Sequence, residues 1–300
     1  MESLKTILYF SIFKYPLKLE EICSFYPVKD REKVEMELEQ LIARKIICKV
    51  EDFYLPDCDV ECIEKRKKGN AMAVQALVKA AEKARFIAKF PFVEAVGVSG
   101  SLSKGYYDDN SDIDFFVITK PGKVWITRTL LMLYKKIFLL NSRKYFCINY
   151  FMSSANLEVE EKNRFTATEI KTLIPFQGKD VLEMFYSKND WVSDIFGPLT
   201  PNLDAVPNIK KPLLSIWIEF LLDNRFGHLI DSAFKHTTVR FWKMKFRKMN
   251  IDDFKIALKS TKSISKHHPL NFQKKVILAL NEKYEELRKK HNIELPKEYA

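Results

Sequence analysis

The sequence has few of the features that mark fibrous, secreted or membrane-spanning proteins. Only 8 glycines and 12 prolines occur among 300 residues, which excludes a collagenous or low-complexity chain. The longest apolar runs, such as residues 7–13, fall well short of the ~20 residues that a membrane span needs. The apolar run near the N-terminus is not followed by a small-residue cleavage site, so we expect neither a signal peptide nor a membrane partner.

Cysteine is also scarce, and its spacing predicts neither a disulfide framework nor a zinc site. No second Cys or His pair follows Cys58 and Cys62 at the spacing of a zinc site. We therefore expect a cytoplasmic protein whose cysteines are reduced. The five cysteines are Cys23, Cys48, Cys58, Cys62 and Cys147.

The composition is that of a globular protein with an uneven basic excess. Hydrophobic residues make up 47% and charged residues 30%, and 300 residues correspond to roughly two domains. The net charge is +11: residues 1–60 carry nine basic and twelve acidic groups, residues 61–200 carry 21 and 16, and residues 201–300 carry 20 and 11. This excess of basic residues is compatible with contact to a polyanion. A solvated lysine-rich surface explains the excess equally well.

The first sixty residues predict one small domain of three helices and a hairpin. Apolar periodicity favours helices over residues 4–13 and 17–25 and a third helix capped by Asp30. Residues 45–50 and 53–55 are typical of a hairpin. This order resembles a winged helix. Residues 30–44, however, contain five acidic and only three basic side chains. A helix that approaches DNA phosphates usually presents lysine and arginine, so we do not expect DNA binding through the third helix.

The remaining chain predicts an α+β domain followed by helices. Residues 61–90 form a connecting helix, interrupted near Gly69, and residues 91–200 form a domain of mixed sheet and helices. Residues 201–300 follow a proline-rich connection and form a helical region. The expected strands of the central domain are residues 93–98, 113–119 and 145–152, with a helix over residues 124–140 between the last two.

The most informative motif is a Gly-Ser pair followed by two aspartates. Gly100 and Ser101 end the first expected strand, where a residue without Cβ lets backbone amides approach a phosphate closely. Lys104 adds a cation nearby. Asp112 and Asp114 lie two residues apart, so on a strand both carboxylates would leave the same face. Paired hard oxygen ligands of this kind suit Mg²⁺ when substrate phosphates supply further ligands.

The ordered strand, Gly-Ser pair and Asp-x-Asp motif resemble the nucleotidyltransferase superfamily related to DNA polymerase beta. The resemblance covers about residues 85–155. More of the chain is similar to a narrower group of uncharacterised bacterial proteins that carry a nucleotidyltransferase domain behind a winged helix. The matching segments of that group are residues 125–128, 147–150, 166–169 and 266–269.

The superfamily resemblance implies roles for particular residues. Gly100 and Ser101 would bind the triphosphate of an NTP with Lys104 nearby, and Asp112 and Asp114 would hold Mg²⁺ or Mn²⁺. The carboxylate that the superfamily places on the third strand falls on Asn149, whose amide is neutral and cannot act as a base. Glu158 could replace that carboxylate only if the strand curls back.

These residues leave two hypotheses for function. The first is Mg²⁺-dependent transfer of a nucleoside monophosphate from an NTP to a hydroxyl of a small molecule, a protein or RNA, and the Asp112/Asp114 pair favours it. The second is a nucleotide-sensing or protein-binding module without turnover, which Asn149 favours. Arg128 lies opposite the apolar face of its helix, where it is either solvated or directed at the phosphates, and we expect it to bind the nucleotide. Residues 240–248 interleave basic and aromatic side chains, as either a nucleic-acid surface or an amphipathic helix would.

Overall fold

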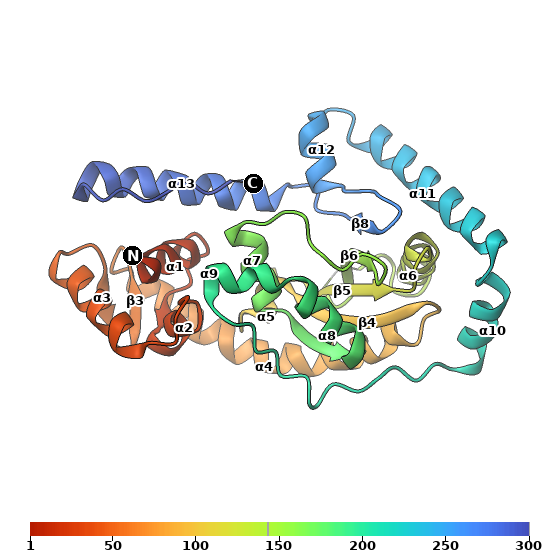
Figure 1. Ribbon diagram of the computed structural model, residues 1–300, viewed down its shortest axis with the longest axis horizontal. Coiled ribbons are helices and arrows are strands. Elements are labelled where there is room, and N and C mark those ends of the chain that lie inside the picture. The colour runs from red at the N-terminus through yellow and green to blue at the C-terminus, as the bar shows by residue number, and fades with distance from the viewer. Residues whose placement is uncertain (143, 300) are drawn as a thin grey trace.

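The computed structural model describes residues 1–142 and 144–299 and shows two sheets surrounded by helices (Figure 1). In the N-terminal unit, a three-stranded antiparallel sheet in the order β1-β3-β2 accompanies three helices. Leu17 and Lys18, expected to be helical, instead pair with β3 as a short strand. The elements are α1 (Glu2–Ser11), β1 (Leu17–Lys18), α2 (Leu19–Ser24), α3 (Arg31–Ala43), β2 (Cys48–Val50) and β3 (Phe53–Leu55).

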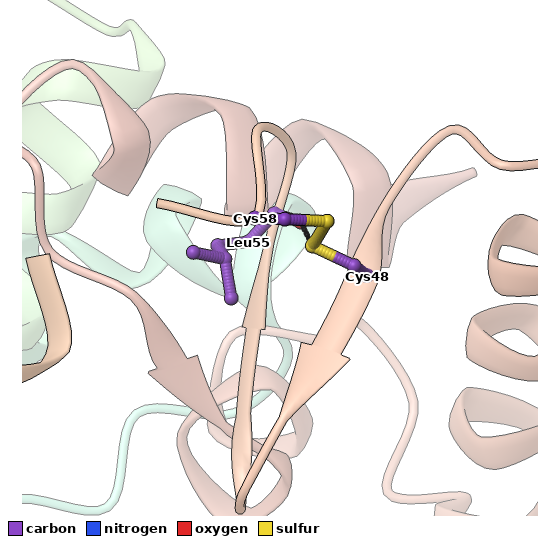
Figure 2. The surroundings of a disulfide bond; sticks show 3 residues. All are labelled: Cys48, Leu55 and Cys58. Carbon is purple, nitrogen blue, oxygen red and sulfur yellow. Dashed lines mark hydrogen bonds between the residues drawn. A yellow bond between two sulfur atoms is a disulfide. The ribbon is translucent and has the colours of Figure 1, made fainter. Parts of the chain in front are cut away.

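A disulfide joins Cys48 and Cys58 in this unit, so the expectation of fully reduced cysteines is wrong for this pair (Figure 2). Cys48 lies on β2 opposite Leu55, and Cys58 follows β3. The hairpin thereby brings the two Cα atoms to 5.7 Å, within the range of a disulfide. Residue spacing alone did not indicate the pair, because the approach depends on the register of the hairpin. The other three cysteines are free, and Cys147 is buried.

The central sheet has five strands in the order β7-β4-β5-β6-β8. Strands β5 and β6 are parallel, and the other pairs are antiparallel. The sequence did not predict the edge strands β7 and β8, which have four and three residues and show little periodicity. Strand β8 belongs to residues 201–300, which we expected to be helical. This C-terminal region therefore supplies one edge strand of the central sheet. The strands are β4 (Val93–Ser99), β5 (Asp114–Thr119), β6 (Cys147–Ser153), β7 (Ile174–Gln177) and β8 (Ile264–Lys266).

Helices cover both faces of the central sheet, as the alternating side chains of β5 require. Phe115 and Val117 pack in one core with α4 and α6, whereas Phe116 and Ile118 pack in the other with α7 and α8. Helix α4 continues through Gly69, where the interruption was expected, and glycine is needed there because an added Cβ would overlap the ring of Tyr106. The helices are α4 (Val60–Ala88), α6 (Val124–Phe138), α7 (Arg164–Lys171) and α8 (Lys179–Lys188).

The C-terminal region contacts both the central domain and the N-terminal unit. Helix α11 packs on α6, and α13 contacts α1 and α7, so it lies beside the N-terminal unit in Figure 1. Within the described ranges, no helix is both long enough and apolar enough to cross a bilayer. The α-helices that follow α8 are α9 (Ser193–Phe196), α10 (Leu213–Leu222), α11 (Arg225–Lys245), α12 (Ile251–Ala257) and α13 (Phe272–His291).

The connection between β8 and α13 should make stability depend on pH. Burial lowers the pKa of His268 to about 4, with nearby Lys266 acting in the same direction. Between pH 6.5 and pH 4 the unfolded chain binds a proton at this histidine that the folded protein does not, so His268 lowers the stability as the pH falls. In urea unfolding, the difference in stability between the wild type and His268→Gln should change by about 3 kcal/mol over this interval. His236→Gln, on an exposed histidine of α11, should follow the wild type.

Candidate functional site

The candidate site is centred on the junction between β4 and α5 (Gly100–Ser103), where the Gly-Ser motif lies. Gly100 has φ +72°, a conformation that side chains with Cβ rarely adopt. Its neighbour Ser99 pairs with Asp114, the first residue of β5. A Cβ on Gly100 would lie 2.5 Å from Oδ2 of Asp114. Glycine at this position therefore allows the Gly-Ser segment to pack directly against an aspartate of the Asp-x-Asp motif.

Glu169 on α7, which the sequence analysis did not select as a site residue, binds the Gly-Ser segment. Glu169 accepts the backbone N–H of Gly100 at 3.2 Å and pairs with Nζ of Lys104 at 2.7 Å. The same ammonium donates to the carbonyl of Gly100 at 3.0 Å. The hydroxyl of Ser101 makes no hydrogen bond within the described part of the chain. This arrangement shows that the amide and the lysine of the motif are both positioned to bind an anionic oxygen.

The two aspartates lie close together but not on one strand. Asp114 begins β5, whereas Asp112 belongs to the preceding segment. Burial, with the charges of Asp112 and Glu169 acting in the same direction, raises the pKa of Asp114 to about 7, against the opposing effects of Lys104 and the nearby thiol of Cys147. Asp114 therefore interacts with two further carboxylates, Asp112 and Glu169, and with one lysine. This surplus of negative charge, made of hard oxygen donors, fits a divalent cation.

Asn149 lies beside Asp114, as the sequence predicted from its place on the third strand. Its Nδ2 donates a hydrogen bond to Oδ1 of Asp114 at 2.6 Å, and its Oδ1 accepts from the thiol of Cys147 at 3.2 Å. The register between β5 and β6 shifts at this point, which leaves Asn149 without a partner opposite on β5. The chain thus presents a neutral amide where the superfamily resemblance implies a carboxylate.

Glu158, the alternative considered for the missing carboxylate, is not brought to the site. It lies in the loop after β6, is about half exposed, and pairs with Lys162 at 2.7 Å. Glu169 is the acidic residue that reaches the Gly-Ser segment. The sequence offered one signal for it, since Glu169 closes the segment 166–169 that matches the narrower bacterial group. Along the described residues, no cluster of three or more metal-ligating side chains is already assembled.

Arg128 is separated from the Gly-Ser segment by the sheet. Its guanidinium lies 4.8 Å from the ring of Trp242 and 5.9 Å from that of Trp125, which both pack in the core beneath α6. Burial lowers the pKa of Arg128 to about 10. The side chains of Phe116 and Ile118, which alternate in step with Asp114 along β5, face the opposite core. The structure therefore stacks Arg128 on two tryptophans rather than bringing it to the predicted phosphate site.

The N-terminal unit touches the loop that carries Lys104. The hydroxyl of Tyr15 donates to the carbonyl of Lys104 at 2.9 Å. Asn70 on α4 donates to the hydroxyl of Tyr15 at 3.1 Å and also to the carbonyl of Gly105. Tyr15, between α1 and β1, and Asn70 on α4 thus fix the backbone at the end of the Gly-Ser segment.

Comparison with known proteins supports the family of the central domain. Residues 77–171 match the family model described as "Nucleotidyltransferase domain". The matched segment contains the Gly-Ser pair, both aspartates, Asn149 and Glu169. No similar curated protein and no similar solved structure was found. The match supports nucleotidyl transfer as the general activity, without specifying its substrates.

Proposed function

We propose that this protein transfers a nucleoside monophosphate from an NTP·Mg²⁺ complex to an acceptor hydroxyl. The observation that carries the proposal is the direct packing of the Gly100 backbone against Asp114, with Lys104 and Glu169 around it. An anion-binding amide and two metal-binding carboxylates converge there, and phosphoryl chemistry depends mainly on such positioning and charge neutralisation. The match of residues 77–171 to a nucleotidyltransferase domain supports the same reaction class.

Each residue of the site has one task in this proposal. The N–H of Gly100, the hydroxyl of Ser101 and the ammonium of Lys104 bind the triphosphate, and Asp112 with Asp114 hold the metal. Bound Mg²⁺ or Mn²⁺ would neutralise the phosphates and lower the pKa of the acceptor hydroxyl. Glu169 competes with an incoming phosphate oxygen, because it accepts the same N–H and the same lysine.

The second candidate function is a nucleotide sensor without appreciable turnover. Asn149 supports it, because an amide cannot take the proton of the attacking hydroxyl. The two functions separate in one experiment, in which the protein is incubated with each α-labelled NTP, Mg²⁺ or Mn²⁺ and cell extract. Transfer of label to an extract component is expected of the enzyme. Binding of NTP without labelled product, for all four nucleotides and both metals, is the result expected of the sensor.

The N-terminal unit serves protein packing in this proposal rather than DNA recognition. Its three helices and three-stranded sheet are consistent with the winged-helix resemblance. On α3, however, the exposed Arg31 pairs with Glu35 at 2.8 Å and lies 3.8 Å from Glu20, so its charge is already compensated. Tyr15 of this unit instead contacts the loop of the candidate site.

Gly100→Ala should abolish NTP·Mg²⁺ binding, because the added Cβ would displace Asp114. Gly105→Ala is the matched control: Gly105 has φ +75°, but its added Cβ would meet Asn70 at 3.5 Å and Tyr15 at 3.7 Å, which is ordinary contact. Both variants should lose about 1–2 kcal/mol of folding stability from the left-handed conformation. Calorimetry with ATP and Mg²⁺ should detect binding in Gly105→Ala only; equal affinity in the two variants would contradict the placement of Asp114.

A further inference from the structure

Helix α10 is attached to the protein by its polar face. Lys211, at its start, donates to the carbonyl of Phe90 at 2.6 Å, and Ser215 donates to the carbonyl of Lys89. Glu219 accepts the N–H of Phe92 at 2.6 Å and pairs with Lys211 at 2.9 Å. Lys211 precedes the helix, whereas Ser215 and Glu219 lie four residues apart within it and therefore share one face. That face satisfies the backbone between α4 and β4.

The opposite face of α10 is apolar and exposed to solvent. Most globular helices bury their apolar face and expose the polar one, so α10 has the reverse orientation. In Figure 1 it lies at the edge of the molecule, with no other element outside it. Six large side chains, which are 48% to 76% exposed, form this outer face of α10: Leu213, Leu214, Ile216, Trp217, Phe220 and Leu221.

The outer face is as large as the largest apolar patches that monomers ordinarily expose to water. Each of these side chains exposes on the order of 100 Å² of apolar surface, so the six together expose roughly 600 Å². This equals the upper end of the largest patch on a typical monomer, which is about 300–600 Å². Two such faces together would bury about 1,200 Å², which is the lower end of the range of stable interfaces.

We propose that the outer face of α10 pairs with the same face of a second copy of this chain. The apolar area is what a two-fold dimer interface needs, and a helix of 10 residues can pack antiparallel against its symmetry mate along its whole length. Self-pairing also brings no like charges together at the centre. The only charged residue between Leu213 and Leu222 is Glu219, which faces inward.

The chemistry of α10 favours a second copy over a lipid surface. Helices that lie in a membrane interface keep lysine and arginine on the polar face, where these side chains meet the headgroups. Here the polar face is occupied by hydrogen bonds to residues 89–92. Between Leu213 and Leu222 the outer face therefore offers apolar contact without a cation of its own, which suits a matching apolar helix.

The test is the oligomeric state of the full chain in sedimentation equilibrium. The wild type should be a dimer, and Trp217→Glu with Phe220→Glu should weaken dimerisation at least about tenfold, since central aromatic residues dominate such interfaces. The matched control is Val74→Glu with Val78→Glu, at two valines of α4 that are 66% and 62% exposed. This control should remain a dimer with the wild-type dissociation constant.

The other outcomes overturn the proposal. The first is a monomeric wild type. The second is a dimer that persists in both glutamate variants, and the third is a dimer that is lost in the Val74/Val78 variant as well as in the Trp217/Phe220 variant. A monomeric wild type that floats with phosphatidylglycerol vesicles would assign the outer face to lipid. Should the Trp217/Phe220 variant fail to fold, hydrogen exchange on the wild type decides: amides of residues 213–222 must become more protected as the protein concentration rises, and exchange independent of concentration excludes the dimer.

Discussion

Replacing Asp112 and Asp114 together by asparagine should abolish Mg²⁺-dependent NTP binding and any nucleotidyl transfer. Asparagine keeps the size of each side chain and can still accept a hydrogen bond, but it removes both negative charges. The site then has only Glu169 to balance Lys104 and cannot attract a divalent cation. Since metal ions contribute several kcal/mol to phosphoryl transfer, the rate should fall by about 10³-fold or more.

A second Asp-x-Asp pair in this chain provides the control. Asp57 and Asp59 lie before α4, and Asp59 caps this helix by accepting the N–H of Glu61 at 3.0 Å. Asparagine caps helices as well as aspartate, so Asp57→Asn with Asp59→Asn removes the same charge and should leave the fold intact. Calorimetry with ATP and GTP should show wild-type affinity for this control. Unchanged NTP·Mg²⁺ binding in the Asp112/Asp114 variant would refute the proposed metal site.

The loss should arise without unfolding. Burial and neighbouring carboxylates disfavour the ionised form of Asp114, as the rise of its pKa to about 7 indicates. An uncharged side chain at this position relieves that cost. In the absence of metal, thermal unfolding at pH 8 should therefore show the Asp112/Asp114 variant at least as stable as the wild type.

The sequence predicted those parts of the site that depend on local order along the chain. The Gly-Ser pair and Asp114 occupy the ends of neighbouring strands, so their approach follows once the strands are recognised. Asp30 caps α3 by accepting the N–H of Lys33 at 3.0 Å, as its position before an apolar helical pattern indicated. In each case the interaction links residues whose spacing the secondary structure determines.

The features that the sequence did not predict depend on contacts between distant segments. Glu169 reaches Gly100 from a helix 69 residues later, and β8 joins the sheet beside β6 from the C-terminal region. Arg128 was placed by its helical position alone, whereas its environment is set by Trp242 on α11. Periodicity indicates which face of an element is buried but not which distant element covers it.

Asn149→Asp should raise the rate of nucleotidyl transfer above that of the wild type. In the wild type, Nδ2 of Asn149 donates to Oδ1 of Asp114 at 2.6 Å. An aspartate there would bring a second carboxylate to the same oxygen, so without metal the two groups repel and the folded protein loses stability at pH 8. Bound Mg²⁺ or Mn²⁺ reverses this effect, and the rise in melting temperature on adding metal should be larger than for the wild type.

The same substitution supplies a proton acceptor for the attacking hydroxyl, a contribution typically worth about 10²–10⁴ in rate. We therefore expect the rate of label transfer to rise by about 10²-fold. Asn149→Ala, which removes the hydrogen bond without adding charge, should give no increase. If Glu169 already accepts the proton, Asn149→Asp leaves the rate unchanged, and Glu169→Gln lowers it in the wild type but not in the Asn149→Asp background. A clear loss of transfer in Asn149→Asp, with folding and NTP binding intact, would show that the amide itself is required, because the variant differs from the wild type only by the charge and hydrogen bonding of this side chain.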